Sequence, residues 1–197
     1  MKTFQHLLSP LQIRSLSLAN RLVMPPMGTA LGNFDSTVSE ANLAYMKRRV
    51  QSGVGLIITE IAAVHPSGLV SPVSLGVWDD KFIPGLSKMA DVIHAGGTKA
   101  ALQLHHSGRE NYFLLKQKNA VAPSAVSSFV YGFLGTPREM TLAEIEEIIK
   151  SFGEGAKRAK NAGFDMVELH GAHGYLLMQF LSAHSNLRQD QYGGDFK

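Results

Sequence analysis

Two histidines and a tyrosine lie close together near the C-terminal end of the chain. His170 and His173 follow a short apolar run, Asp165–Leu169, and Tyr175 comes two residues after the second histidine. In a β/α barrel, side chains at the C-terminal ends of strands face the substrate. Two imidazoles can donate N–H groups to a developing oxyanion, and a phenol can transfer a proton. These three residues are therefore the first catalytic candidates.

Short apolar runs alternate with amphipathic segments, and this order predicts the elements that position the candidates. Four runs are predicted as strands: Asn20–Pro26, Gly55–Ile61, Lys99–Leu104 and Asp165–Leu169. A small hairpin is expected within Leu7–Leu18, before the first of them. The strands and helices alternate, which favours parallel strands joined by right-handed crossovers and hence an α/β fold.

Helix boundaries follow from capping signals. The patterns Thr37-x-x-Glu40 and Thr141-x-x-Glu144 are typical capping boxes and predict helices that reach about Ser52 and Ala162. A third helix begins near Phe82 and ends at the glycine pair 96–97. The buried face of the helix after Thr141 is predicted from its apolar spacing: Leu142, Ile145, Ile149, Phe152 and Ala156.

The number of βα units suggests part of a larger fold. A closed (β/α)8 barrel of the TIM type has eight units and typically about 250 residues. The 197 residues here provide four units and a hairpin. We therefore expect residues 1–197 to form the N-terminal part of one barrel domain.

Composition narrows the functional classes. The formal charge is +3, with 19 Lys and Arg dispersed against 16 Asp and Glu, so neither nucleic acid nor a membrane surface is an expected partner. There are no cysteines to form disulfides, thiolate zinc sites or iron–sulfur clusters. No stretch resembles a signal peptide or a membrane helix, and a cytoplasmic location is expected.

Four motifs occur in order along the chain: LSPLQIRSLSLANRLVMPPM, GVGLIITEIAAVHPSG, ALQLHHSGR and HGAHGYLLMQFLS followed by NLRQDQYGG. Together they resemble the old yellow enzyme family, the FMN-dependent ene-reductases. They correspond to the hairpin and first strand, and to the second, third and fourth strands of the family. The resemblance extends from Leu8 to Gly194 and implies a TIM barrel of which the chain is the N-terminal half.

The resemblance also implies a cofactor and a substrate class. NADH or NADPH would reduce FMN, and hydride would then pass to the β-carbon of an enone, enoate or dienoyl-type substrate. His170 and His173 would hold the activating carbonyl of the substrate, His170 would also approach the flavin, and Tyr175 would protonate the α-carbon. Flavin contacts are implied for six other residues: Pro25, Pro26, Met27, Gly28, Ile61 and Gln103.

Some positions depart from the family pattern. Gly28 stands where members often carry a thiol or hydroxyl, and Ile61 is larger than the residue expected beside the flavin. Ala30 lies where some members place an aromatic substrate lid. These differences favour the branch of long dienoyl or enoate reductases. Phosphate contacts in such barrels come from the loops after strands seven and eight, so this chain alone is expected to bind FMN poorly and to be inactive.

Two alternatives remain at this point. Strand-end histidines (His170, His173 and either His105 or His106) could instead hold the metal of a TIM-barrel hydrolase. The second alternative is a non-catalytic half-barrel that associates with a partner or with itself, because open sheet edges pair readily. For the protein as a whole, a homo-oligomer is expected. If His105 and His106 are not ligands, they are expected to stabilise the loop after the third strand.

Overall fold

The computed structural model describes residues 4–117 and 119–194. At its centre lies a parallel sheet in which neighbouring strands follow one another along the chain. Its strands in spatial order are β3 (Val23–Met24), β4 (Leu56–Ala63), β6 (Lys99–His105) and β9 (Met166–Leu169). All four predicted strands are therefore present and in the predicted order. The first is shorter than predicted, because Pro25 and Pro26 have no N–H to donate to a ladder.

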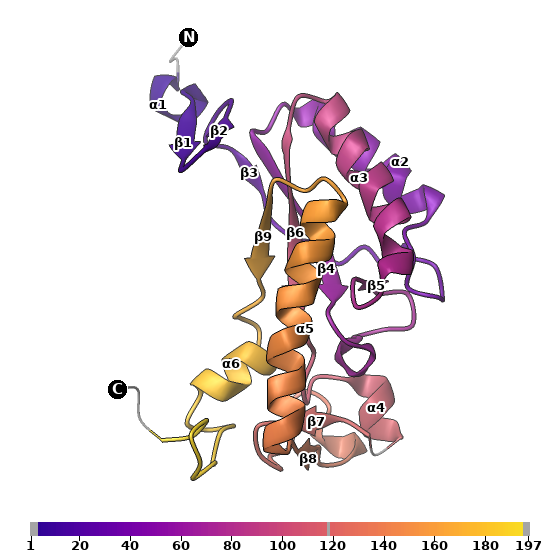
Figure 1. The fold of residues 1–197 in the computed structure, drawn as a ribbon, viewed down its shortest axis with the longest axis vertical. Helices are drawn as coiled ribbons and strands as arrows, with labels where there is room; N and C mark the ends of the chain where they lie inside the picture. The colour runs from indigo at the N-terminus through magenta and orange to yellow at the C-terminus, as the bar shows by residue number, and fades with distance from the viewer. Residues whose placement is uncertain (1–3, 118, 195–197) are drawn as a thin grey trace.

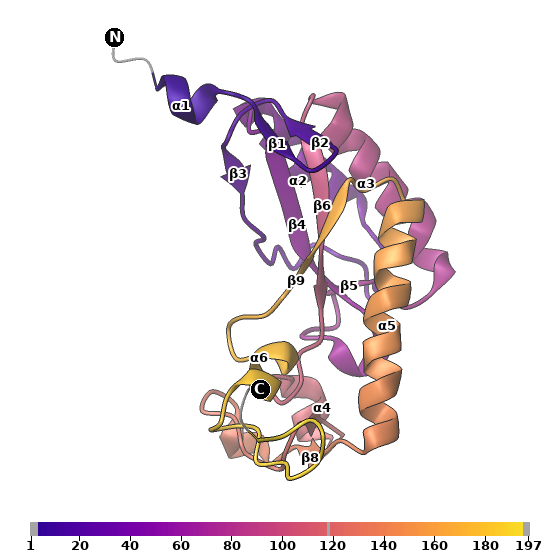
Figure 2. The same cartoon turned by 60° about the vertical axis from the view of Figure 1, so that its left-hand side comes forward.

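Three helices cover one face of this sheet: α2 (Glu40–Arg49), α3 (Ile83–Ala95) and α5 (Leu142–Asn161). Figure 1 shows α5 running along the sheet, with α2 and α3 beside it, and Figure 2 shows the same layers after a turn of the view. The main core fills the space between these two layers. It contains fully buried side chains from both layers, among them Ile57, Leu86, Met89, Ile93, Leu102 and Leu104.

The predicted hairpin is formed by β1 (Leu11–Ile13) and β2 (Leu16–Leu18), which pair antiparallel. It lies at the N-terminal end of the sheet, far from the ends of the strands that carry the candidates (Figure 1). Leu18 packs there against Leu56 and Ala101. A short helix not expected from the sequence, α1 (Gln5–Leu8), precedes the hairpin.

The connections contain several short elements. Around the carboxyl ends of the strands lie α4 (Tyr112–Lys116), α6 (Leu176–Leu181) and the two-residue strands β5 (Leu75–Gly76), β7 (Val121–Ala122) and β8 (Arg138–Glu139). Single 3-10 turns occur at η1 (Val50–Ser52), η2 (Pro66–Gly68), η3 (Asp80–Phe82) and η4 (Gly132–Leu134). No helix of the described residues combines the length and the apolar character needed to cross a bilayer.

One predicted helix start is wrong by two residues. Helix α2 is capped by Ser39, whose hydroxyl accepts a hydrogen bond from the backbone N–H of Asn42. In return, the side-chain carbonyl of Asn42 accepts one from the backbone N–H of Ser39. Thr37 is instead bonded to the side chain of Asp35, in a turn before the helix. The capping box of α5 is confirmed, since Thr141 and Glu144 bond reciprocally.

The predicted buried face of α5 is partly wrong. Ile145 is buried as expected, but Leu142 is 44% exposed and Ile149 is 57% exposed. The buried line along the helix instead continues through Ile148, Gly155 and Ala159. Gly155 lies where a Cβ would come 3.2 Å from Val64, so the helix approaches the sheet closely at that point. The apolar residues used for the prediction therefore form a stripe on α5 that is rotated away from the side facing the sheet.

Candidate active site at the strand ends

A cavity of about 700 Å³ lies at the carboxyl ends of the four parallel strands. We call it the strand-end cavity. Its lining includes nearly every residue predicted for the site: Pro25, Pro26, Gly28, Ile61, Gln103, His170, His173 and Tyr175. Met27 belongs to the same segment but does not line the cavity, and it is 44% exposed. Residues far apart in the sequence thus converge because parallel strands end at the same edge.

The two histidines contact one another. The distance from Nδ1 of His173 to Nε2 of His170 is 3.3 Å, and the ring planes are nearly perpendicular. His170 is buried, and its burial, together with the neighbouring His173, lowers the pKa of His170. His173 is exposed and has a positive φ of 55°, which turns the chain sharply after the strand. Both rings therefore belong to one cluster, in which His170 favours the neutral form.

Hydrogen bonding assigns the hydrogen of His170. The amide of Ala172 donates to Nδ1 of His170 over 3.4 Å, so a neutral His170 carries its hydrogen on Nε2. That hydrogen is then directed at Nδ1 of His173, which leaves Nε2–H of His173 free to donate. If both rings are to donate to the same substrate oxygen, the contact between them must open.

Tyr175 is the N-cap residue of α6, which places its ring over the end of β6. Its ring meets the edges of two imidazoles, with centroid distances of 4.4 Å to His105 and 4.8 Å to His170. Burial, and then the nearby Tyr131 and Glu110, raise the pKa of Tyr175 above that of a free phenol. The phenol consequently stays protonated and can serve as a proton donor.

Gln103 has a partner that the sequence did not suggest. Its side-chain amide donates to Oε1 of Glu168 over 2.7 Å, across the neighbouring strands β6 and β9. This bond engages one hydrogen of the amide and fixes which end of the group is the carbonyl. The second hydrogen and the carbonyl oxygen remain for a ligand. The strand register places Gln103 opposite Glu168. Register cannot be determined from a single sequence, so this partner could not be predicted.

His105 and His106 lie behind the cavity wall. Neither ring nitrogen of His105 has a hydrogen-bond partner among the described residues, although the side chain is 1% exposed. His106 accepts the Gly108 amide and bonds to Ser67, which agrees with its expected role in the loop. Burial lowers the pKa of His106 to about 3 and that of His105 well below its usual value. Both rings are therefore neutral.

Two arginines bind the loops near the strand ends. Arg188 donates to the carbonyls of Pro123 and Met140 and pairs with Asp190. Arg109 lies near the carboxylate of Glu110 and donates to backbone carbonyls at 126 and 127. The bonds of Arg188 tie the segment after α6 to the loops that follow β6.

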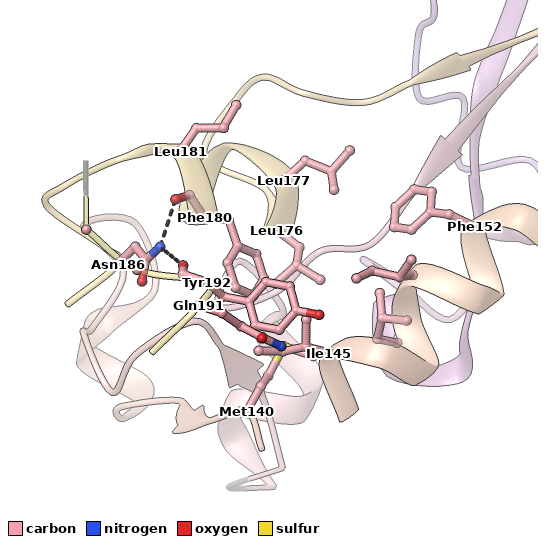
Figure 3. A pocket seen from close by; sticks show the side chains of 14 residues that line it. Met140, Ile145, Phe152, Leu176, Leu177, Phe180, Leu181, Asn186, Gln191 and Tyr192 are labelled. Atoms are coloured by element: carbon pink, nitrogen blue, oxygen red, sulfur yellow. Dashed lines mark hydrogen bonds between the residues drawn. The ribbon is translucent and has the colours of Figure 1, made fainter. Parts of the chain in front are cut away.

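A second hollow, the α5–α6 groove, shares no lining residue with the strand-end cavity (Figure 3). Its volume is about 510 Å³. The lining is largely aliphatic and aromatic: Met140, Ile145, Ile148, Ile149, Phe152, Leu176, Leu177, Phe180, Leu181, Asn186, Gln191, Tyr192, Gly193 and Gly194. Asn186 there donates to the carbonyls of Phe180 and Tyr192, so its amide is occupied.

Within residues 4–117 and 119–194, no group of three or more His, Cys, Asp or Glu side chains is placed to hold an ion. His170 and His173 contact each other, and His105 is enclosed behind Tyr175. The arrangement instead offers imidazole and amide N–H donors and one phenol.

The sequence matches the model of the NADH:flavin oxidoreductase / NADH oxidase family over residues 6–197. It is 46% identical over 200 residues to an NADH oxidase of Thermoanaerobacter brockii, covering 100% of this chain and 30% of that protein. It is 43% identical over 192 residues to an NADPH dehydrogenase of Halalkalibacterium halodurans, covering 97% of this chain and 55% of that protein.

Solved structures agree. Morphinone reductase in complex with tetrahydroNAD superimposes with a TM-score of 0.87 at 35% identity, over 96% of this chain and 55% of the other. Old Yellow Enzyme from Pichia sp. AKU4542 superimposes with a TM-score of 0.90 at 32% identity, over 96% of this chain and 52% of the other.

These matches define the class: a flavin-dependent oxidoreductase fold of the TIM-barrel type, present here as its first four βα units. The chain belongs to the NADH:flavin oxidoreductase / NADH oxidase family, which is the old yellow enzyme family. It spans between 30% and 55% of the length of the curated relatives named above. FMN and NADH or NADPH are the cofactors that belong with this assignment.

The strand-end cavity fits FMN in three respects. Its volume lies within the range typical of cofactor sites, about 300–1,000 Å³. A Cβ added at Gly28 would meet nothing within 4 Å, so there is open space beside that backbone. Gln103 keeps one donor and one acceptor free, which matches the alternating groups on a flavin pyrimidine edge.

Proposed function

We propose that residues 1–197 form the N-terminal part of one FMN-binding barrel domain of an oxidoreductase that reduces activated C=C bonds with NADH or NADPH. The observation that carries the proposal is the convergence of Gln103, His170, His173 and Tyr175 on the strand-end cavity. Gln103 would bind the pyrimidine edge of FMN, and the segment Pro25–Gly28 would lie against its ring system. Ile61 and His170 would also contact the cofactor.

When bound, FMN would supply the hydride chemistry that links NADH or NADPH to the β-carbon of an α,β-unsaturated substrate. The residues of the chain act on the other atoms of that substrate. Nε2–H of His173 donates to the carbonyl oxygen, and Nε2–H of His170 joins it when the contact between the rings opens. These donors stabilise negative charge on the oxygen as the β-carbon accepts hydride.

Tyr175 completes the addition. Its hydroxyl gives a proton to the α-carbon, and solvent then returns a proton to the phenolate. The raised pKa of Tyr175 keeps the proton in place until the α-carbon becomes basic. The product is the saturated carbonyl compound, with one hydride at the β-carbon and one proton at the α-carbon.

The test uses the full-length protein, purified and kept free of oxygen. We expect it to carry FMN, to be reduced by NADH or NADPH, and to convert a simple enone such as cyclohexenone into the saturated ketone. Deuteride from labelled nicotinamide should appear at the β-carbon, as read by mass spectrometry. A protein that carries FMN but returns the enone unchanged would contradict the proposed substrate class.

The 197-residue polypeptide alone is proposed to bind FMN poorly. No Lys or Arg side chain lines the strand-end cavity of the described residues, so a dianionic phosphate has no cationic partner there. Charge-assisted hydrogen bonds are about twice as strong as neutral ones. Titration of this polypeptide followed by flavin fluorescence, with light scattering to report self-association, tests the point. Submicromolar binding by a monomer would contradict it.

A further inference from the structure

Glu60 is a buried carboxylate with no assigned role. It lies in β4 and is 3% exposed. One oxygen accepts the Thr29 amide over 3.2 Å, and the other accepts the Thr29 hydroxyl and the side-chain amide of Asn42, the latter over 3.0 Å. None of the ion pairs formed within the described chain includes Glu60. A carboxylate held only by neutral donors is costly to bury, so its position requires an explanation.

An irregularity in β4 determines where Glu60 points. Ile58 pairs with Ala101 and Ile61 pairs with Gln103, so β4 has one residue more than β6 between these pairs. Simple alternation would put Glu60 on the same face of the sheet as Ile58. The bulge instead brings Ile61 to the strand-end cavity and directs Glu60 toward α2, where Asn42 lies.

The bonds of Glu60 join three separate elements. Thr29 follows Pro25, Pro26 and Gly28, which line the cavity, and Asn42 lies in the first turn of α2. Residues 27–32 make no backbone-to-backbone hydrogen bond with the described chain. Side chains hold this segment instead. Besides the bonds to Glu60, the hydroxyl of Thr29 accepts a hydrogen bond from the backbone N–H of Leu31. The backbone carbonyl of Leu31 in turn accepts a hydrogen bond from the hydroxyl of Ser39.

We propose that Glu60 is a positioning residue, which fixes the Pro25–Gly28 wall of the strand-end cavity in the place that the ligand requires. The inference rests on the proposed function in one respect, namely that this ligand is FMN. Glu60 itself does not line the cavity and touches no reacting atom. It acts through Thr29, one residue beyond the wall, and Asn42 orients its carboxylate from the helix side.

In the hydrogen bond between Asn42 and Glu60, the amide donates and the carboxylate accepts. Exchanging the amide and the carboxylate between these two positions therefore tests the contact directly. In Glu60→Gln, a single amide oxygen faces three donors, and the new NH2 group faces the NH2 group of Asn42. In Asn42→Asp, two carboxylates face each other, and the bond from the Asn42 side-chain amide to the Thr29 hydroxyl, 3.3 Å long, is lost as well. In the double variant Glu60→Gln/Asn42→Asp, the introduced amide at position 60 can donate to the introduced carboxylate at position 42, which still accepts from Ser39. The total charge is then that of the wild type.

The full-length protein is measured in two ways. Flavin fluorescence gives the Kd for FMN, and hydrogen exchange of the apoprotein gives the opening rates of the Thr29 and Leu31 amides. Each single variant should weaken FMN binding roughly 10-fold and speed exchange at both amides, because a hydrogen bond to a charged group is lost. The double variant should return both quantities close to wild type. Glu146→Gln, on the exposed face of α5, is the matched control and should change neither.

Two results would overturn the proposal. Faster exchange or a lower melting temperature with an unchanged Kd for FMN would make Glu60 merely structural. A double variant no better than the weaker single variant would show that the Glu60–Asn42 contact is not the source of the effect. If the wild-type protein fails to bind FMN, the proposed function fails, whereas the exchange rates still decide whether Glu60 holds the segment.

Discussion

The strand-end cavity and the α5–α6 groove are both hollows of several hundred cubic ångströms, but they are built from different parts of the elements. The groove is formed by the sides of helices and by the segment after α6, and its lining is mostly apolar (Figure 3). The cavity is formed where strands end, and side chains of Gln103, Glu168, His170, His173 and Tyr175 meet there. An apolar hollow offers burial, whereas convergent polar groups with shifted pKa values offer chemistry.

The largest difference between the two regions should appear with their tyrosines. Tyr175→Phe in the full-length protein should slow reduction of the alkene about 10²–10⁴-fold, because the proton donor is lost, while reduction of FMN by NADH or NADPH continues. Tyr192→Phe, in the groove, should leave both half-reactions unchanged. Stopped-flow absorbance resolves the two steps. An equal loss in both half-reactions for Tyr175→Phe would rule out a dedicated proton donor.

Removing a donor at the oxyanion should have the next largest effect. His173→Ala should slow the alkene step about 10²–10³-fold, because one preorganised N–H group is lost. His173→Asn, which keeps an N–H donor, should recover part of that rate. His184→Ala serves as control, since His184 stacks on Phe129 and does not line the strand-end cavity. Rates for His173→Ala equal to wild type would remove this residue from the mechanism.

Acid sensitivity should come from the polar region as well. The pKa values of His105 and His106 are lowered, so the unfolded chain binds more protons than the folded chain below about pH 6.5. The free energy of unfolding should therefore fall as the pH falls below about 6.5, by up to about 1.4 kcal/mol per pH unit for each ring.

His105→Leu separates the two rings. It removes a ring with two unpaired nitrogens, so it should raise the free energy of unfolding at about pH 7 by about 1–3 kcal/mol and weaken the acid dependence. His106→Leu should lower stability at the same pH, since Ser67 and Gly108 lose a partner. Urea denaturation at a series of pH values measures both, and an unchanged acid dependence for His105→Leu would refute its assignment as a neutral buried ring.

The smallest effects are expected in the groove. Ile145→Val should cost about 0.5–1.5 kcal/mol, because the side chain is 3% exposed and its methyl group leaves a gap. Ile149→Val should cost close to nothing, since Ile149 is 57% exposed. Neither change should alter the two half-reactions. Chemical denaturation measures both costs, and equal values for the two variants would mean that Ile149 is covered in the protein tested.

The sequence was most informative about the strands. Four apolar runs predicted the strands, and the segment Leu7–Leu18 predicted the hairpin. The resemblance to the old yellow enzyme family singled out Gln103, His170, His173 and Tyr175, which share the strand-end cavity. Predictions were less accurate where two nearby residues could each cap the same helix. Ser39 caps α2 in place of Thr37, because Asp35 had already engaged the threonine.

The partners of Gln103 and Glu60 could not be predicted. The pairing of Gln103 with Glu168 depends on strand register. The position of Glu60 depends on a bulge, which moves one side chain across the sheet without leaving any pattern of glycine or proline. Both are properties of two strands together. The same limit explains the misplaced stripe on α5, since apolar spacing alone does not say which side faces the sheet.

We propose that FMN occupies the strand-end cavity and leaves the α5–α6 groove free. Hydrogen exchange of the full-length protein, with and without saturating FMN, tests this directly. We predict slower exchange with FMN at Met27–Thr29 and at Gln103–Ser107, and unchanged exchange in α6 and at the exposed face of α5. Protection confined to the residues that line the groove would contradict the account.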